Sequence, residues 1–522
     1  MLFRSDETLG IGALGLVNRG FDTVIMPEMG RKLCESGCVS CGMCISVCPT
    51  GALKERCFNT KDIPAKMESN ETVCEFCSVG CKIDVQTSGN LVMKADAIDG
   101  SEAGMGLACG RGKFGLFTRY TEPLDSYLGS EKVDEDTAVK AFAGVVGDAA
   151  ENKYVSISSR YTTEEMAAIR NFANAIDAKV VSHDTGDCGA HKVFGTSKPL
   201  ADFDSLENAD LILCVLDVHS NPIISPRLIN LAKQGKEIVM ITNQEGTTRG
   251  FGISHLNTDK KGSGIAEVFA GVVKLTEKKD EVFGTELVKY VEKINPGTEA
   301  MEVAKRYISA KNPAIVYSDS IVTCDGAILL SDMAAAKGNN LIHLRKKNNT
   351  QGLLDSGIEP ARPDEGGLLI SFGEDITDDM RKRFEKIVHI DVLHSDKADV
   401  FIREPNGVKR GGSFTNAEGR VQPVKNRFIK EAKEKDMYDL LNDVLNELGI
   451  KDMVIDYEAA VKTVESEVYG KNYIGSKYIA TDEDINLNFM IPKTDTLMEE
   501  QGTSDALHTK ISEELAKLIK QR

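Results

Sequence analysis

The stretch that decides the fold is CEFCSVGC, residues 74–81, which places Cys74, Cys77 and Cys81 in one short loop. Cys109 follows after a gap of 27 residues, in GLACGRGKFG. The resulting spacing, C-x2-C-x3-C-x27-C, brings three thiols from one loop and a fourth from a returning segment, which is enough to enclose a cubane iron–sulfur cluster. Four cysteines suit Zn²⁺ equally well by ligand count alone, so zinc stays open at this point.

A second group of cysteines lies upstream, in CVSCGMCISVCP (38–49). Its spacing, C-x2-C-x2-C-x3-C-P, is that of bacterial ferredoxins with [4Fe–4S] clusters. Two-cluster ferredoxins contain this run twice, and the last cysteine of each run binds the other cluster, whereas this sequence contains it once. The fourth ligand is therefore open among Cys34, Cys48, Cys57 and a residue of a partner subunit. The expected cysteine ligands of two [4Fe–4S] clusters are Cys38, Cys41, Cys44, Cys48, Cys74, Cys77, Cys81 and Cys109.

The composition indicates a cytoplasmic, globular, metal-binding protein. Ten of the 13 cysteines lie between Cys34 and Cys109, and the N-terminus has no basic region followed by an apolar core, so metal ligation is favoured over disulfides. No apolar stretch approaches the roughly 20 residues that span a bilayer. The net charge of −17 argues against nucleic acid or an anionic membrane as the main partner.

The cysteine motifs resemble the N-terminal [4Fe–4S] domain of the molybdopterin oxidoreductase family, which includes formate dehydrogenase alpha subunits and the large iron–sulfur subunit of complex I. Arg111 stands where many members have a lysine, and Lys113 where they have an arginine. In catalytic members the first of these basic residues lies between cluster and pterin, so the resemblance implies a cofactor-binding position for Arg111. Four further segments match the family: IGALGLVNRGFDT (11–23), HSNPIISPRLINLAKQGKEIVMI (219–241), KNNTQGLLDSGIEP (347–360) and GGSFTNAEGRVQ (411–422).

The chain after the cysteine-rich part predicts an α/β fold with doubly wound sheets, because strands alternate with helices. A helix is expected over 162–176, opened by a threonine cap with a glutamate behind it. The expected strands are 153–159, 178–183, 209–218, 237–242, 314–320, 367–373 and 386–392. The expected domains are a ferredoxin-like segment (1–66), a second [4Fe–4S] domain (67–125), Rossmann-like α/β lobes (126–430) and a helical C-terminal extension (431–522) with amphipathic helices at 434–450 and 504–522.

A working molybdenum site is not expected. In catalytic members a cysteine or selenocysteine binds the metal, and the nearest stretch here is DCGAHKVFG (187–195). If Cys188 matches the first cysteine of that pattern, the metal position falls on Lys192, whose ammonium cannot replace a thiolate. Only about 90 residues follow residue 430, which are too few for the C-terminal barrel domain that completes the pterin pocket. We therefore expect no bound molybdopterin and no catalytic residue, and we interpret Cys214 and Cys324 as isolated thiols.

These observations predict an electron-transfer subunit of a multi-subunit cytoplasmic oxidoreductase. The resemblance implies anaerobic metabolism and other redox subunits as partners: a flavin- and NAD(P)-binding subunit, a hydrogenase or formate dehydrogenase catalytic subunit, or ferredoxin. The alternatives are a catalytic, formate-dehydrogenase-like subunit with a molybdenum or tungsten bis-pterin, and a zinc-stabilised assembly scaffold without redox function. Neither nucleic acid nor an integral membrane segment is expected.

Overall fold

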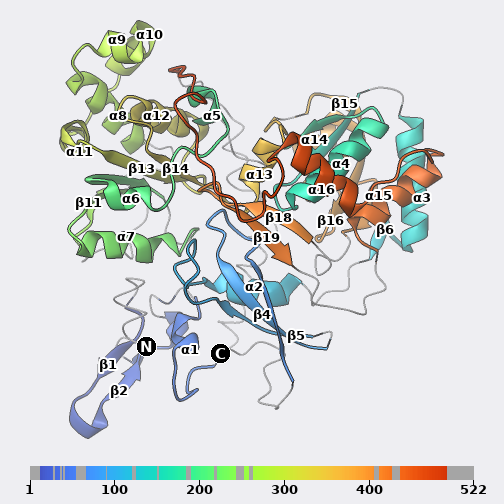
Figure 1. Ribbon diagram of the computed structural model, residues 1–522, viewed down its shortest axis with the longest axis horizontal. Helices are drawn as coiled ribbons and strands as arrows, with labels where there is room; N and C mark the ends of the chain where they lie inside the picture. Colours follow the sequence, from blue (N-terminus) through green and yellow to red (C-terminus); the bar gives the residue numbers. More distant parts are fainter. Residues whose placement is uncertain are drawn as a thin grey trace.

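The fold of the chain is given by a computed structural model (Figure 1). The residues that it describes are 12–27, 30–35, 38, 41–54, 66–89, 91–119, 125–149, 152–183, 190–216, 220–242, 252–257, 263–361, 363–404, 411–425 and 435–490. Within these ranges, no helix has the length and apolar character needed to cross a bilayer.

The first α/β lobe contains a seven-stranded sheet in the order β7-β6-β17-β16-β15-β8-β9. The strands from β17 to β9 are parallel, and β6 and β7 join antiparallel at one edge. The strands are β6 (Ser126–Leu128), β7 (Glu131–Val133), β8 (Lys153–Ile157), β9 (Lys179–Val181), β15 (Gly366–Phe372), β16 (Phe384–Asp391) and β17 (Val400–Arg403). The helices are α3 (Glu135–Asp148), α4 (Thr163–Ala175), α13 (Thr350–Asp355), α14 (Asp378–Arg383), α15 (Met437–Glu447) and α16 (Tyr457–Glu467).

Helix α4 shows how local sequence and core packing agree in this lobe. The Thr162 hydroxyl accepts the backbone N–H of Glu165 at 3.2 Å, and the Glu165 carboxylate accepts the N–H of Thr162 at 2.9 Å, which forms the expected capping box. Farther along α4, the fully buried Phe172 ring contacts Phe142 of α3 and Phe372 of β15, with ring centroids 5.9 and 6.4 Å apart. The cap therefore starts the helix where its apolar face meets the sheet.

The second lobe contains a five-stranded parallel sheet in the order β12-β11-β10-β13-β14. Every residue of β10 and β13 is buried, as expected for central strands of a parallel sheet with helices on both faces. The strands are β10 (Leu211–Val215), β11 (Glu237–Thr242), β12 (Ser254–Asn257), β13 (Pro313–Ser318) and β14 (Leu341–Leu344). The helices are α5 (Ala190–Phe194), α6 (Ser205–Asn208), α7 (Ile224–Lys233), α8 (Ser263–Leu275), α9 (Lys279–Phe283), α10 (Thr285–Glu292), α11 (Thr298–Ser309) and α12 (Cys324–Ala335).

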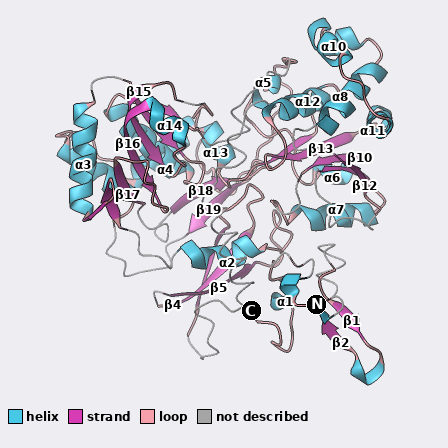
Figure 2. Cartoon of the chain, turned by 180° about the vertical axis from the view of Figure 1, so that it is seen from behind, coloured by secondary structure: helices cyan, strands magenta, loops and turns pink. Residues whose placement is uncertain are grey.

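The cysteine-rich part lies beneath the two lobes, as the views from opposite sides show (Figures 1 and 2). It contains a three-stranded antiparallel sheet, a short hairpin and two helices. The hairpin of β18 and β19 joins it to the lobes, because β19 contacts β3 and β18 contacts α4. These elements are β1 (Gly15–Val17), β2 (Val24–Met26), β3 (Glu68–Val73), β4 (Lys82–Ser88), β5 (Leu91–Ala97), β18 (Gly411–Thr415), β19 (Val421–Lys425), α1 (Met43–Ser46), α2 (Gly110–Arg119) and the 3-10 turns Gly20–Asp22 and Leu33–Glu35.

The predicted fold class and all seven predicted strands are confirmed. Helix α16 was not predicted individually, although it lies in the expected helical extension, between the two helices predicted there. Asp456 caps this helix by accepting the N–H of Ala459 at 2.7 Å, and its buried Val464 packs with Ala167 of α4. The predicted helix at 504–522 lies outside the described residues.

The segment 469–490 runs from the first lobe to the second and holds them together. Its Tyr473 hydroxyl hydrogen-bonds Glu164 of α4, and its Asn486 donates to the carbonyl of Phe194 in α5 at 2.8 Å. Between these points, the Tyr478 and Tyr469 hydroxyls both donate to the Asp355 carboxylate at the end of α13. Burial raises the pKa of Asp355 to about 6, and these hydroxyl bonds oppose that rise.

We expect Asp355→Asn to alter how stability depends on pH. Because the pKa of Asp355 is higher in the folded chain (about 6) than its ordinary value of 3.8, the folded state binds the extra proton. Protonated Asp355 therefore contributes to the free energy of unfolding. This contribution is fully present below the ordinary pKa of 3.8 and is lost as pH rises through about 6. The free energy of unfolding of the wild type should therefore fall by up to about 2 kcal/mol relative to the variant between pH 4 and 7. Anaerobic urea unfolding followed by circular dichroism measures this difference.

Asp484→Asn is the matched control in the same segment. Lys198 lowers the pKa of Asp484 to about 2, so this carboxyl titrates below the pH window. Parallel stability curves for the wild type and Asp355→Asn would contradict the assignment.

Candidate metal centres

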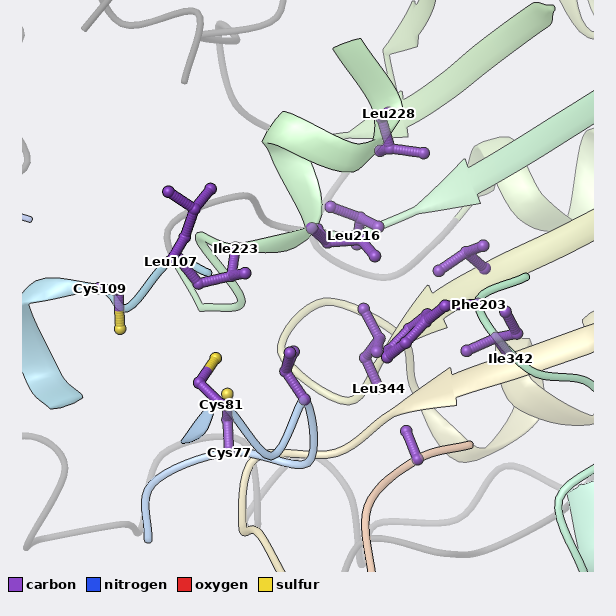
Figure 3. Packing of buried hydrophobic residues seen from close by; sticks show 14 of the residues in the cluster. Cys77, Cys81, Leu107, Cys109, Phe203, Leu216, Ile223, Leu228, Ile342 and Leu344 are labelled. Atoms are coloured by element: carbon purple, nitrogen blue, oxygen red, sulfur yellow. The ribbon is translucent and has the colours of Figure 1, made fainter. Parts of the chain in front are cut away.

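Four cysteines converge at the top of the three-stranded sheet. Cys74 directly follows β3 and Cys81 directly precedes β4, and the N–H of Cys74 donates to the carbonyl of Cys81 at 2.8 Å, which closes the loop. Cys109 directly precedes α2. All four side chains are buried and none is in a disulfide. The sulfur atoms of Cys77, Cys81 and Cys109 point toward a common space (Figure 3). The structure therefore brings together the group predicted from C-x2-C-x3-C and the later cysteine.

Two glycines let the backbone approach these sulfur atoms. A Cβ built on Gly112 of α2 would lie 3.2 Å from the Cys74 sulfur. A Cβ on Gly104 would lie 3.2 Å from the Cys81 sulfur and 2.7 Å from the Leu107 carbonyl oxygen. Neither position has room for a larger residue without movement of the thiols.

The electrostatics of this group require a positive partner. Burial raises the pKa of the Cys74, Cys77 and Cys81 thiols, and their mutual repulsion adds to the rise for Cys74 and Cys81. Arg111 supplies positive charge: its guanidinium hydrogen-bonds Cys109 and donates to the Ser220 carbonyl. Burial opposes the charge on Arg111, but the neighbouring thiolates raise its pKa on balance. The predicted role of Arg111 beside a pterin stays a prediction.

Side chains from the lobes and from the β18–β19 hairpin hold the cysteine loop, and their role was not predicted from the sequence. The Asn348 amide donates to the Cys74 carbonyl, the Asn416 amide to the Val79 carbonyl at 3.1 Å, and the Gln422 amide to the Gly80 carbonyl at 2.9 Å. Asn221 hydrogen-bonds the Cys77 thiol from the second lobe. All four amides lie inside the downstream segments that resembled the family. The sequence therefore marked these residues, but it did not show that they contact the cysteine loop.

The described cysteines of the upstream group have different surroundings. The thiols of Cys38, Cys41 and Cys44 lie close enough to interact electrostatically, and burial raises the pKa of Cys41 to about 11. The Cys48 sulfur accepts the Leu53 N–H and lies 3.6 Å from the Thr50 hydroxyl oxygen, and these contacts lower the pKa of Cys48 to about 7. The side chain of Cys34 and all of Cys57 lie outside the described residues, so the fourth ligand stays open.

Across the described part of the chain, no group of three or more His, Cys, Asp or Glu side chains is arranged to hold one metal ion. The eight predicted cysteine ligands are all outside disulfides. Zinc and an iron–sulfur cluster both stay predictions at these thiols.

A small cavity lies beside α5, the helix that contains Lys192. Its volume is about 30 Å³, which is room for one or two waters. Its polar lining includes His191, Lys198, His343, Arg345 and Gln351. In the first lobe, Arg160 and Asp391 form a buried ion pair at 2.9 Å. The expected absence of molybdopterin stays a prediction.

The remaining residues that the sequence analysis singled out are placed as follows. Lys192 lies in α5, and Cys188 lies outside the described residues. Cys214 is buried in β10, and burial raises its pKa. Cys324 begins α12 and is disulfide-bonded, so its interpretation as an isolated thiol is wrong. The sequence could not reveal this bond, because Cys324 lies in no cysteine motif.

Comparisons with known proteins agree with the two cysteine sites. Residues 67–121 match the model of the molybdopterin oxidoreductase Fe4S4 domain, and residues 35–54 match that of a 4Fe-4S binding domain. NADPH-Fe(3+) oxidoreductase subunit alpha of Geobacter sulfurreducens is 21% identical over 85% of this chain and 63% of its own length. A subunit of the NADH-quinone oxidoreductase of Rhizobium meliloti is 32% identical over 111 residues, which are 21% of this chain and 13% of that protein.

Among solved structures, acetylene hydratase from Pelobacter acetylenicus superposes with a TM-score of 0.56 at 12% identity, covering 78% of this chain and 74% of that one. This likeness concerns the fold alone. The chain spans less than two thirds of the length of the two curated relatives.

We expect Gly112→Ala to weaken the second centre. Alanine favours a helix over glycine by about 1 kcal/mol, but at this position the new methyl group must displace the Cys74 sulfur. The variant should therefore retain less iron after anaerobic purification, with a loss of up to about one cluster.

Gly144→Ala in α3 is the matched control, because a Cβ there meets nothing within 4 Å. It should keep the full iron content and gain up to about 1 kcal/mol in stability. Equal iron in the two variants would refute the close approach of α2 to Cys74.

Proposed function

We propose that the chain, whose residues 67–121 match the molybdopterin oxidoreductase Fe4S4 domain, is an electron-transfer subunit of a multi-subunit oxidoreductase, with two [4Fe–4S] clusters. The observation that carries this proposal is the placement of two cysteine groups in adjoining loops of one hydrophobic core. Met43, which lies between Cys41 and Cys44, packs in the same buried cluster as Cys74, Cys77 and Cys109. Each cluster would supply reversible one-electron chemistry.

The chain's own residues would contribute ligation, charge and exclusion of water. Cys74, Cys77, Cys81 and Cys109 would hold the second cluster in a fully buried site. Cys38, Cys41 and Cys44 would hold the first, with the fourth ligand open. Arg111 would offset the negative charge of the second site, and the amides of the lobes would fix its loop. The lobes then act as a scaffold, since a packed fold can persist without the chemistry of its relatives.

The names of the two relatives, each a subunit of a larger oxidoreductase, support redox partners. We propose a flavin- and NAD(P)-binding subunit, a hydrogenase or formate dehydrogenase catalytic subunit, or ferredoxin, in the cytoplasm. An exposed apolar hairpin supports such a contact near the first cysteine group. Its exposed side chains are Leu16 (62%), Phe21 (111%), Val24 (44%) and Ile25 (45%).

Metal analysis of the anaerobically purified chain tests the function. We expect about eight irons per chain, a brown colour and a [4Fe–4S] EPR signal on reduction, because two clusters hold about four irons each. Near-stoichiometric molybdenum or tungsten with formate-dependent dye reduction would favour a catalytic subunit instead. A colourless protein with bound zinc would favour the scaffold.

Cys109→Ser tests the second site. Serine removes the ligand that α2 contributes, so we expect the loss of about four irons while the first cluster remains. The matched control is Cys214→Ala, which removes a buried thiol in β10 and should leave the iron content unchanged. Unchanged iron in Cys109→Ser would refute the assignment.

The fourth ligand of the first site is tested by comparing Cys34→Ser with Cys48→Ser. If Cys34 is the fourth ligand, Cys34→Ser should damage the first cluster and Cys48→Ser should spare it. The EPR signal of the first cluster measures both effects. The reverse pattern would assign Cys48 as the ligand.

A further inference from the structure

Lys113 is a buried cation between the two cysteine groups. It lies one turn into α2, and its backbone N–H donates to the Cys109 carbonyl at 3.0 Å. Its side chain is only 3% exposed, which is rare for lysine. The Nζ atom forms an ion pair with Asp96 of β5 at 2.8 Å, and it donates to the Gly42 carbonyl at 3.4 Å and to the Ser46 hydroxyl. One side chain thus connects the helix that begins at the second cysteine site with the loop of the first.

The contact between α2 and the first loop is tight. The Ser46 hydroxyl also donates to Asp96 at 2.9 Å, so Lys113, Asp96 and Ser46 form a closed network. Gly42 has a φ of +71°, and a Cβ built on it would lie 2.7 Å from the Phe114 ring. Because no larger side chain fits there, α2 lies directly against the backbone beside Cys41. The network and this contact fix the first loop relative to the second.

The positive charges are divided between the two sites. Lys113 acts electrostatically on the thiols of Cys41 and Cys44, whereas Arg111 acts on those of the second group. Asp96 faces Lys113 from β5, and the partly exposed Lys94 pairs with the same carboxylate at 3.2 Å. A buried ion pair is weak evidence for stability by itself, because desolvation offsets much of its attraction. Its position beside a redox site suggests another role.

We propose that Lys113 is a positioning residue that raises the reduction potential of the first cluster, with Asp96 partly offsetting its charge. This inference rests on the proposed function. In the step concerned, a reduced redox partner loses one electron and the first cluster gains it, and no bond or proton is transferred. The added negative charge is stabilised by a nearby buried cation, because the low-dielectric surroundings screen it weakly.

Potentiometric EPR titration of the full chain tests the proposal with opposite charge changes. Lys113→Met removes the cation and should shift the midpoint potential of the first cluster to a more negative value. Asp96→Asn removes the anion and should shift it to a more positive value. The second cluster should move less in both variants. A purely structural role would not give shifts of opposite sign, so shifts in the same direction, no shift, or an equal shift of the second cluster would overturn the proposal.

Two further variants separate an effect of charge on the potential from an effect of lost structure. Lys113→Arg keeps the charge and should keep the first midpoint close to that of the wild type, even if Lys113→Met loses iron. Lys94→Met removes a cation that pairs with the same Asp96 but is 37% exposed, so solvent should reduce its effect to a small shift. A large potential shift in Lys113→Arg would also overturn the proposal. Failure of the proposed function would instead be evident in the wild type, as an absence of iron and of an EPR signal.

Discussion

The burial of four thiols at one site constrains much of the rest of the structure. Cys74, Cys77, Cys81 and Cys109 are all at most 8% exposed, where a thiolate is unfavourable without a positive partner. Arg111 supplies positive charge beside these thiols, and Gly104 and Gly112 leave room for the sulfur atoms of Cys81 and Cys74. The loop also has backbone carbonyls that must find donors inside the protein. Those donors come from residues more than 260 positions later in the chain, so the site and the two lobes depend on each other.

This dependence gives the α/β body a structural role in a chain for which we propose electron transfer. The Asn348, Asn416 and Gln422 amides satisfy carbonyls of the cysteine loop, and the loss of one would leave a buried acceptor unpaired, at a cost of about 1–3 kcal/mol. The lobes in turn are tied to each other by segment 469–490. The fold of the lobes therefore contributes to the enclosure of the second site.

The sequence predicted what short-range spacing and periodicity control. Cysteine spacing predicted that Cys74, Cys77 and Cys81 share one loop, and the N–H of Cys74 donates to the carbonyl of Cys81 across it. The role of Cys48 stays a prediction, because in two-cluster ferredoxins this cysteine serves the other cluster. The pattern of apolar residues located the strands of both sheets, and the capping box located the start of α4. These features depend on residues within one turn or one strand of each other.

Long-range pairing could not be predicted in the same way. The ion pair of Lys113 and Asp96 joins α2 to β5, and neither residue lies in a motif that predicts the other. The disulfide of Cys324 likewise follows no spacing rule. The amide donors were visible as motifs, but their target became evident only when both lobes were placed over the loop. Helix α16 was not predicted because its apolar side is only a few residues wide. The contact of this side with α4 is evident only in the folded chain.

The two cysteine sites differ in exposure, and this difference gives the proposed relay a direction. The four thiols of the second site are buried, whereas those of Cys38, Cys41 and Cys44 are only partly covered. Electron transfer depends steeply on distance, so a partner would reach the less covered first site more readily. Lys113 then stands on the boundary between the accessible and the enclosed site, with its charge directed at the former. A cation there stabilises the reduced state of the proposed first cluster. The size of this stabilisation sets how readily the electron passes farther into the protein.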